Sequence, residues 1–278
     1  MKNFALLSLI VLIPFFGLAQ KKYPFDVKIS GSGKQSIIFI PGFSCSGDVW
    51  NDTKADYEKD YTCYTLTMAG FAGTPAQPNA SFKGWEDGIA AFISDKKILK
   101  PIIVGHSMGG GLAMALAADY PALPSKVIVV DALPCLAALM DPSFKSKTPL
   151  DCSAITNQML SVSDEQFRQM QQQSMQRMVT DPAKQELVVN WSVKSDRKTF
   201  GDMYCDFSNT DLRDKIANVT CPTLVLLESY FTNLKPAIED QYKKLKTGDF
   251  RYSTKGLHFI MYDDKDWFDS QLASFIRG

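Results

Sequence analysis

The residues that could do chemistry in this chain begin with the sequence GHSMG at residues 105–109. The three residues before it, Ile-Ile-Val, are typical of a buried strand, and the alanine-rich residues 112–119 are typical of a helix. A serine on a tight turn between strand and helix needs small neighbours, because the turn strains its backbone and leaves little room. Glycines at 105, 109 and 110 provide that room. The pattern therefore predicts that Ser107 is a nucleophile.

A serine nucleophile needs a general base, and the sequence contains only two histidines. His106 adjoins Ser107 in the turn itself, where its side chain points away from the serine oxygen. His258 follows the last predicted strand on a loop, from which it can reach the carboxyl edge of a sheet. We therefore predict that His258 is the base, since activating a hydroxyl requires an imidazole within hydrogen-bond reach.

The developing oxyanion also needs hydrogen-bond donors. The backbone N–H of Met108, directly after the nucleophile, is one predicted donor. The second is expected from the loop that follows Ile40, where Gly42 lets the backbone turn its amides toward the site. We predict that Phe43 supplies it.

Strands and helices alternate along the part of the chain that must position these groups. Five strands and three helices are expected before residue 131. The strands are expected at 27–30, 36–40, 62–67, 101–104 and 126–130, and the helices at 50–59, 85–96 and 108–120. This alternation predicts an α/β fold with a mostly parallel central sheet and helices on both faces.

The alternation stops at residues 132–219, where helix signals replace strands. Ser163 and Gln166 form a predicted capping box, and Asp181-Pro182 is typical of a helix start. Strands at 223–227 and 250–253 and helices at 236–246 and 265–276 then complete the sheet. We expect a core built from residues 20–131 and 220–278, with residues 132–219 inserted as a helical lid.

In these motifs the chain resembles the α/β-hydrolase superfamily, in its capped, small-molecule-hydrolysing branch. The matching pieces are the loop at residues 40–43, the turn at 105–110 and Gly256-x-His258-Phe259. The resemblance implies a helical lid inserted after the sixth strand and a triad in the order serine, acid, histidine. Dehalogenases and epoxide hydrolases of this superfamily use an aspartate nucleophile, and the serine at 107 excludes them.

The triad acid departs from the family pattern. Phe231 stands where the resemblance implies an aspartate, a few residues beyond the strand at 223–227. Two replacements keep the order: Asp131, at the end of the preceding strand, and Glu228, at the end of the strand at 223–227. A carboxylate that orients an imidazole must be held rigidly. We favour Asp131 and keep Glu228 as the alternative; Asp131 as a helix cap is the non-catalytic interpretation.

The first residues predict a signal peptide. Residues 4–19 carry no charge, follow Lys2 and end in Gly17-Leu18-Ala19. The run is shorter than a bilayer span and is broken by Pro14. We expect cleavage after residue 19, a periplasmic or secreted protein, and no stable membrane span after cleavage; a retained membrane anchor is the alternative.

Composition bounds the other partners. Thirty basic and thirty acidic residues balance, without a basic stripe, so no nucleic-acid binding is predicted. The six cysteines match no zinc pattern, and neither a metal nor a cofactor is required. Export favours disulfides: Cys135 with Cys152 is one expected pairing, and buried free thiols are the alternative.

These features together predict an exported serine hydrolase with a small-molecule substrate. The acyl-enzyme on Ser107 would form from a small or medium carboxylic ester, lactone or thioester. Lid residues such as Met159, Met170, Met175 and Met178 either line an apolar pocket or pack the lid onto the body. An amide or C–C bond hydrolase on the same fold is one alternative, and a catalytically inactive, hydrolase-like binding protein is another.

Overall fold

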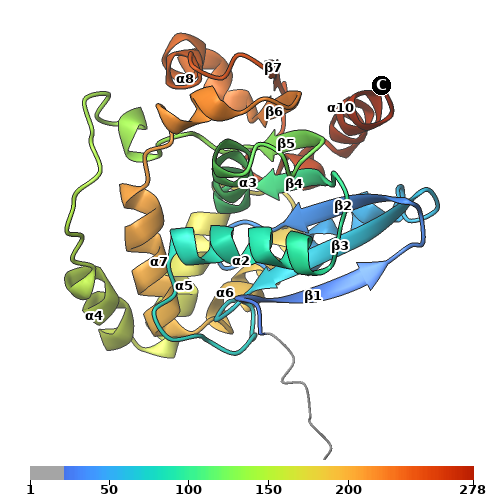
Figure 1. Ribbon diagram of the computed structural model, residues 1–278. Helices are drawn as coiled ribbons and strands as arrows, with labels where there is room; N and C mark the ends of the chain where they lie inside the picture. The colour runs from blue at the N-terminus through green and yellow to red at the C-terminus, as the bar shows by residue number, and fades with distance from the viewer. Residues whose placement is uncertain (1–21) are drawn as a thin grey trace, which may run out of the picture.

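The computed structural model describes residues 22–278, and the predicted signal peptide lies outside the described residues. Within residues 22–278 a seven-stranded sheet, in the order β1-β3-β2-β4-β5-β6-β7, runs through the molecule (Figure 1). β1 pairs antiparallel with β3, and the remaining pairs are parallel. The strands are β1 (Phe25–Ser30), β2 (Gln35–Ile40), β3 (Tyr61–Met68), β4 (Ile102–His106), β5 (Lys126–Val130), β6 (Thr223–Leu227) and β7 (Gly248–Tyr252). The predicted α/β class is confirmed.

The central strands are buried on both faces, as their sequences predict. Every residue of β4 and β6 is buried, and β5 is buried except at its first residue. Branched apolar residues without polar alternation are typical of parallel strands that helices cover on both sides. This core fixes the carboxyl ends of β2, β4, β5 and β6, from which the functional loops leave.

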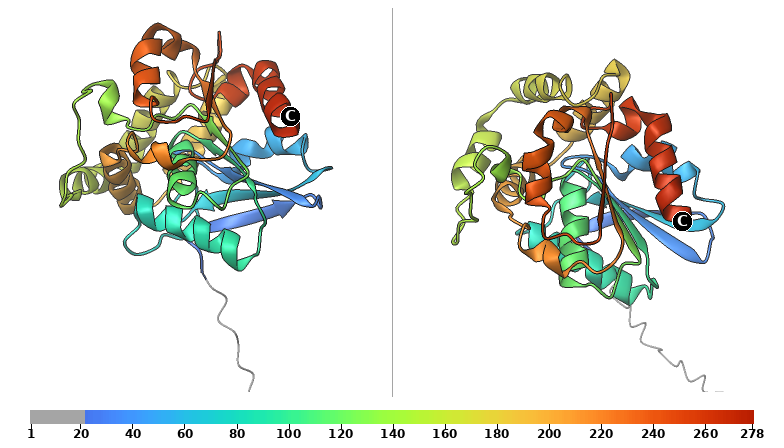
Figure 2. Two further views of the ribbon diagram at one scale, coloured as in Figure 1. Left: turned by 45° about the horizontal axis from the view of Figure 1, so that its top comes forward. Right: turned by 90° about the horizontal axis from the view of Figure 1, so that it is seen from above.

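Helices cover both faces of the sheet. Seen from above, α1 and α10 lie on one side of the sheet and α3 and α8 on the other (Figure 2). The two hydrophobic clusters follow this division: one contains Trp50 and Phe268, the other Trp85 and Leu112. The helices of the body are α1 (Asn51–Ala55), α2 (Phe82–Asp95), α3 (Met108–Asp119), α8 (Lys235–Gln241), α9 (Ile260–Asp263) and α10 (Lys265–Arg277), with 3-10 turns η1 (Gly47–Trp50) and η4 (Ser229–Leu234). The 3-10 turn η3 (Lys215–Asn218) lies at the end of the inserted segment, residues 132–219.

Two body helices are shorter than the sequence predicts. The helix expected at 50–59 ends at Ala55, because the amides of Asp56 and Tyr57 bond three residues back instead of four. The helix expected at 236–246 likewise ends at Gln241. Neither change moves a strand.

Residues 132–219 form no strand and lie to one side of the sheet, on the left in Figure 1. Their helices are α4 (Ser153–Ser161), α5 (Asp164–Met175), α6 (Pro182–Val193) and α7 (Arg197–Asn209), after the 3-10 turn η2 (Ala137–Leu139). The capping box at Ser163 and the helix start at Asp181 are both confirmed. The insertion follows β5, not a sixth strand, because only five strands precede it within residues 22–131.

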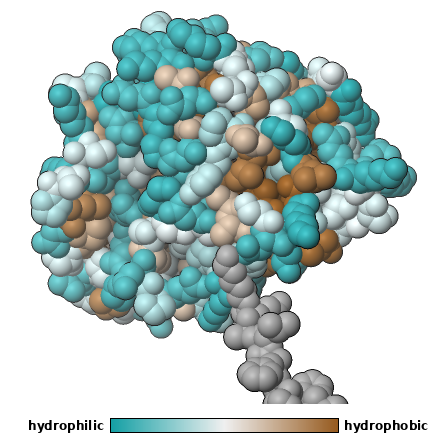
Figure 3. Space-filling model, viewed as in Figure 1, coloured by the Kyte–Doolittle hydropathy of each residue, from teal (hydrophilic) through white to brown (hydrophobic). Residues whose placement is uncertain are grey.

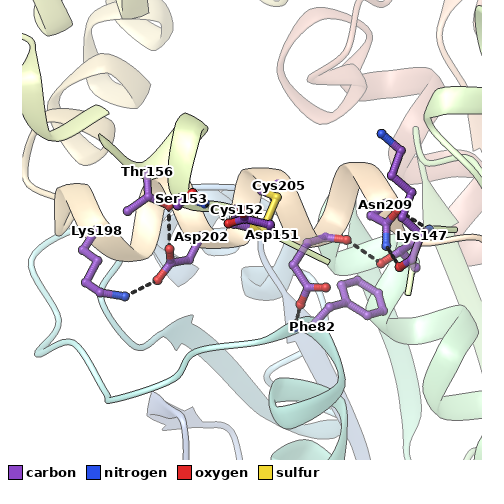
Figure 4. The surroundings of a disulfide bond; sticks show 12 residues. Phe82, Lys147, Asp151, Cys152, Ser153, Thr156, Lys198, Asp202, Cys205 and Asn209 are labelled. Atoms are coloured by element: carbon purple, nitrogen blue, oxygen red, sulfur yellow. Dashed lines mark hydrogen bonds and ion pairs between the residues drawn. A yellow bond between two sulfur atoms is a disulfide. The ribbon is translucent and has the colours of Figure 1, made fainter. Parts of the chain in front are cut away.

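A disulfide joins α4 to α7 inside this lid. Cys152 bonds Cys205, so the expected Cys135–Cys152 pairing is wrong (Figure 4). Cys135 instead is a buried free thiol, and its backbone N–H donates to the Gln241 side chain. The Thr156 hydroxyl donates to Asp202 at 2.6 Å and adds a second α4–α7 link, which Figure 4 also shows.

The surface carries few exposed apolar side chains. The face in Figure 3 is mostly hydrophilic, with one larger hydrophobic cluster right of its centre. Among the helices of residues 22–278, none combines the length and the apolar character that crossing a membrane requires.

Candidate active site

Ser107 lies in a strained turn at the end of β4. Its φ of 53° and ψ of −121° depart from helix and strand values, and its N–H donates to the Val130 carbonyl at 2.8 Å. The neighbouring glycines are sterically required. A Cβ at residue 105 would lie 2.1 Å from the Gly109 carbonyl oxygen, and one at residue 109 would lie 2.5 Å from that of Ile40. The turn therefore packs tightly between β2, β4 and α3 and presents the serine at the carboxyl edge of the sheet.

Asp131 holds the ring of His258. Its Oδ2 accepts a hydrogen bond from His258 Nδ1 at 2.6 Å, and its Oδ1 accepts the backbone N–H of Glu228 at 2.8 Å. Asp131 is buried, has a φ of 46°, and donates its own N–H to Leu226 in the neighbouring strand. Of the two acids that the sequence left open, Asp131 contacts the imidazole, whereas Glu228 contacts Asp131 through its backbone.

Charge and burial have opposite effects on the pKa of His258 in its pair with Asp131. Burial works to lower the pKa of His258, but the hydrogen bond and negative charge of Asp131, with the charge of Glu228, raise that pKa above its ordinary value. Burial and the charge of Asp131 raise the pKa of Glu228 to about 7. The ring of His258 is thus set to hold a proton more firmly than a free imidazole does.

His106 lies against the same ring, a contact that the sequence did not predict. Its Nε2 donates to the backbone carbonyl of His258 at 2.9 Å, and the two ring centroids are 4.7 Å apart. His106 is fully buried, and burial holds its pKa well below its usual range, so the ring is neutral. Its Nδ1 has no hydrogen-bond partner among the described residues. The ring joins the serine turn to the loop that carries the base.

Of the two predicted oxyanion donors, Met108 lies at the start of a helix and Phe43 lies in the loop after β2. Met108 is the first residue of α3, where a backbone N–H has no partner within the helix. Phe43 lies in a turn closed by a hydrogen bond from the Cys45 N–H to the Gly42 carbonyl, at 3.2 Å. This turn runs close to the nucleophile, since a Cβ at residue 42 would lie 3.3 Å from the Ser107 Cβ.

The lid supports the loop of the base. The Phe259 N–H donates to the Met178 carbonyl at 3.2 Å. Asp263 accepts from the Thr180 N–H and hydroxyl at 2.9 and 2.6 Å, and from the Leu257 N–H at 3.2 Å. The position of His258 therefore depends on the lid as well as on the sheet.

A cavity of about 610 Å³ lies between the lid and the sheet edge. Gly42, Phe43, His106, Ser107, Asp131 and His258 line it from the body. The lid contributes mostly apolar side chains, including Met159, Met175 and Phe200. In residues 22–278, no three His, Cys, Asp or Glu side chains gather as a metal site would need. The arrangement can hold a small molecule against a serine, an imidazole and a carboxylate.

Several known proteins are similar to this chain in sequence or in fold. An uncharacterised protein of Mycobacterium tuberculosis is 32% identical over 107 residues, which is 38% of this chain and only 31% of that protein. The pimeloyl-[acyl-carrier protein] methyl ester esterase of Vibrio atlanticus is 25% identical over 258 residues, 90% of this chain and 96% of that enzyme. The crystal structure of the enol-lactonase from Burkholderia xenovorans superposes with a TM-score of 0.76 at 14% identity, covering 91% of this chain and 96% of that one. The model of the alpha/beta hydrolase family matches residues 37–268, and the chain therefore belongs to this family.

Proposed function

We propose that the protein is a serine hydrolase that cleaves carboxylic esters. The observation that carries the proposal is the 2.6 Å contact between His258 Nδ1 and Asp131 Oδ2, in the cavity that Ser107 also lines. A buried carboxylate on Nδ1 fixes the tautomer that leaves Nε2 free to accept a proton. The strained backbone of Ser107 supports the same role, since such strain persists where function needs it.

In this mechanism Ser107 Oγ attacks the ester carbonyl and His258 Nε2 takes its proton. The carbonyl oxygen becomes an oxyanion that the N–H groups of Phe43 and Met108 bind. His258 then gives the proton to the departing alkoxide, and an acyl-enzyme remains. Water, deprotonated by His258, attacks the acyl carbon, and the proton returns to Ser107 as the acid leaves. Asp131 stabilises the imidazolium in both halves of the reaction. No step needs a cofactor.

An ester is favoured over an amide by the cavity and by the relatives. The cavity lining is largely apolar, which suits an uncharged ester better than a peptide. The Vibrio relative, which matches nearly its full length, is named as a methyl ester esterase. A lactone or thioester of similar size presents the same carbonyl to Ser107.

The experiment is active-site labelling of purified residues 20–278 with a fluorophosphonate, followed by mass spectrometry. We expect a phosphonyl group on Ser107, none on the Ser107→Ala variant, and hydrolysis of p-nitrophenyl esters in preference to aminoacyl anilides. A folded protein that is not labelled and hydrolyses nothing would instead be a binding protein. Labelled protein that prefers anilides would be an amidase.

We also propose that residues 1–19 direct export to the periplasm or the medium. The Cys152–Cys205 disulfide supports this, because such bonds persist in oxidising compartments. Mass spectrometry of the protein from fractionated cells tests it. A mature N-terminus at Gln20 outside the cytoplasm is expected, and full-length protein in the cytoplasm or the membrane would contradict export.

A further inference from the structure

The cavity wall carries polar side chains, including Gln158, Gln171 and Tyr204, but few groups of fixed charge. Among the described residues that line it there is no Lys, Arg or Glu. Its one aspartate, Asp131, is occupied by His258 and the Glu228 amide. An ion moved from water into an apolar site without a counter-charge loses more than packing returns. The part of a substrate that enters the cavity must therefore be neutral.

The lid supplies a flexible apolar wall. Four methionines line the cavity from the lid: Met159 on α4, Met170 and Met175 on α5, and Met178 just after α5. Methionine is unbranched and has a polarizable sulfur, so it adapts to apolar groups of irregular or variable shape. Such a wall fits an aliphatic chain better than a rigid polar ring.

Exposure distinguishes the mouth of the cavity from its interior. Leu136, Met170 and Tyr204 are 41, 38 and 49% exposed, so they form the mouth. Met159 and Phe200 are 8 and 7% exposed and form the interior. Phe167, which is fully buried, packs on Phe200 with ring centroids 5.0 Å apart, and it forms a small lid cluster with Phe200 and Met159.

The volume of the cavity limits the length of the chain that fits. A cavity of about 610 Å³ holds about 20 non-hydrogen atoms at about 30 Å³ each. The ester group and the alcohol share this space, which leaves room for an acyl chain of about six to ten carbons. Longer chains would exceed this volume and extend out through the mouth.

We propose that the natural substrate is a neutral ester of an unbranched, medium-length aliphatic acid, whose chain lies against Met159 and Met175. This inference rests on the proposed esterase function and adds the class of acyl group. It distinguishes the protein from an esterase that recognises a charged acyl terminus. Each methylene that enters the cavity before it is full should raise kcat/KM about fourfold.

The test is a series of p-nitrophenyl esters from acetate to palmitate, with kcat/KM measured for each. We expect a maximum at about six to ten carbons. An ester of the same length that ends in a carboxylate should react at least about 100-fold more slowly. A parallel series of alkyl acetates varies the alcohol instead and should show no such maximum.

Two variants locate the chain. Met159→Trp and Met175→Trp fill the interior and should move the maximum to shorter esters. The matched control is Met140→Trp, since Met140 is a lid residue that is 89% exposed and does not line the cavity. Its profile should equal that of the wild type. Circular dichroism checks that each variant folds. If one interior variant misfolds, the chain-length profile of the other still tests the proposal.

The outcomes separate the two proposals. Absence of fluorophosphonate labelling and of any hydrolysis overturns the esterase function itself. Labelled, active protein whose rate falls steadily from acetate, or which accepts the carboxylate-terminated ester equally well, overturns the substrate class alone. A maximum in the alkyl acetate series would place the chain on the alcohol side and would overturn the acyl assignment.

Discussion

Asp131→Asn is the substitution that tests the catalytic geometry most directly. The asparagine amide can keep one contact of Asp131, because its oxygen still accepts the Glu228 N–H that now lies 2.8 Å from Oδ1. Its NH2 group then faces His258 Nδ1, where the carboxylate oxygen lies at 2.6 Å. Two donors cannot share one hydrogen bond, so the ring takes the tautomer with the proton on Nε2. That nitrogen can no longer accept the proton of Ser107.

The expected loss follows from this change of tautomer. A triad acid replaced by its amide costs about 10⁴-fold in kcat, which corresponds to about 5 kcal/mol of transition-state stabilisation. Glu228→Gln leaves the contact between Asp131 and His258 intact and removes only a nearby charge. A partly exposed ionic interaction contributes about 1 kcal/mol or less, so we expect less than about a tenfold loss at pH 8.

The pH profile separates the two acids further. Burial opposes the charged form of His258, and Asp131 and then Glu228 raise the pKa of its ring. His258 must be neutral to act as a base, so activity rises as pH passes through that pKa. Without the charge of Glu228 the pKa falls, and the acid limb of kcat/KM should move to lower pH in Glu228→Gln.

The assay is hydrolysis of p-nitrophenyl butyrate between pH 5 and 9 by both variants and the wild type, with circular dichroism as the folding control. If Asp131→Asn stays within tenfold of the wild type while Glu228→Gln collapses, the acid has been assigned to the wrong residue. If Glu228→Gln moves the acid limb to higher pH, the electrostatic argument is wrong.

Three further predictions concern the surroundings of the site. His106→Phe removes the hydrogen bond to the His258 carbonyl and should lower kcat up to about 100-fold at constant KM. His106→Gln keeps a hydrogen-bond donor and should retain most of the wild-type kcat. Equal losses of kcat in the two variants would contradict a positioning role for His106. Reducing Cys152–Cys205, which are 53 residues apart, should lower the unfolding free energy by about 4 kcal/mol in urea titrations, and a Cys152→Ser/Cys205→Ser protein should not respond to reductant. Burial, followed by the neighbouring Asp119, raises the pKa of Glu86 to about 7. The folded state therefore keeps a proton that the unfolded chain releases above about pH 4.5, and the unfolding free energy falls as pH rises toward 7. Glu86→Gln should abolish this decline, and equal slopes of unfolding free energy against pH in the two proteins would refute it.

Local sequence was enough for the sheet and for the serine turn. Apolar runs such as residues 127–130 are typical of buried parallel strands, and the glycines around Ser107 are required by contacts of 2.1 to 2.5 Å. Short segments of sequence show the strand pattern and the glycine spacing, although the contact that requires Gly109 is made to Ile40 in β2. The capping box at Ser163 is local in the same sense.

Features that depend on distant contacts were not predictable. The disulfide joins Cys152 to Cys205 because α4 packs on α7, where a Cβ at residue 201 would lie 2.7 Å from the Thr156 Cα. Nothing near Cys152 in sequence encodes that packing. The same holds for His106, whose partner is a backbone carbonyl 152 residues away.

The sequence alone could not decide whether Asp131 or Glu228 is the triad acid, and the structure shows why. Asp131 and Glu228 end adjacent strands, and β5 and β6 are in register, with Val130 opposite Leu226. Both carboxylates therefore leave the sheet at the same edge. What separates them is the backbone: Asp131 has a φ of 46° and a hydrogen bond to Leu226, while the Glu228 N–H points at Asp131. A sequence does not report a single positive φ at a non-glycine residue.

This arrangement gives the end of β6 a different part in the site. In the family pattern that strand is followed by the acid, whereas here it supplies the Glu228 backbone N–H, which donates a hydrogen bond to Asp131 Oδ1 at 2.8 Å. On the proposed assignment the acid follows β5, the strand next to that of the nucleophile, and the end of β6 orients it. Substitutions of the Glu228 side chain should therefore leave that hydrogen bond in place, whereas a proline at this position, which has no N–H, should remove it, loosen Asp131 and lower kcat.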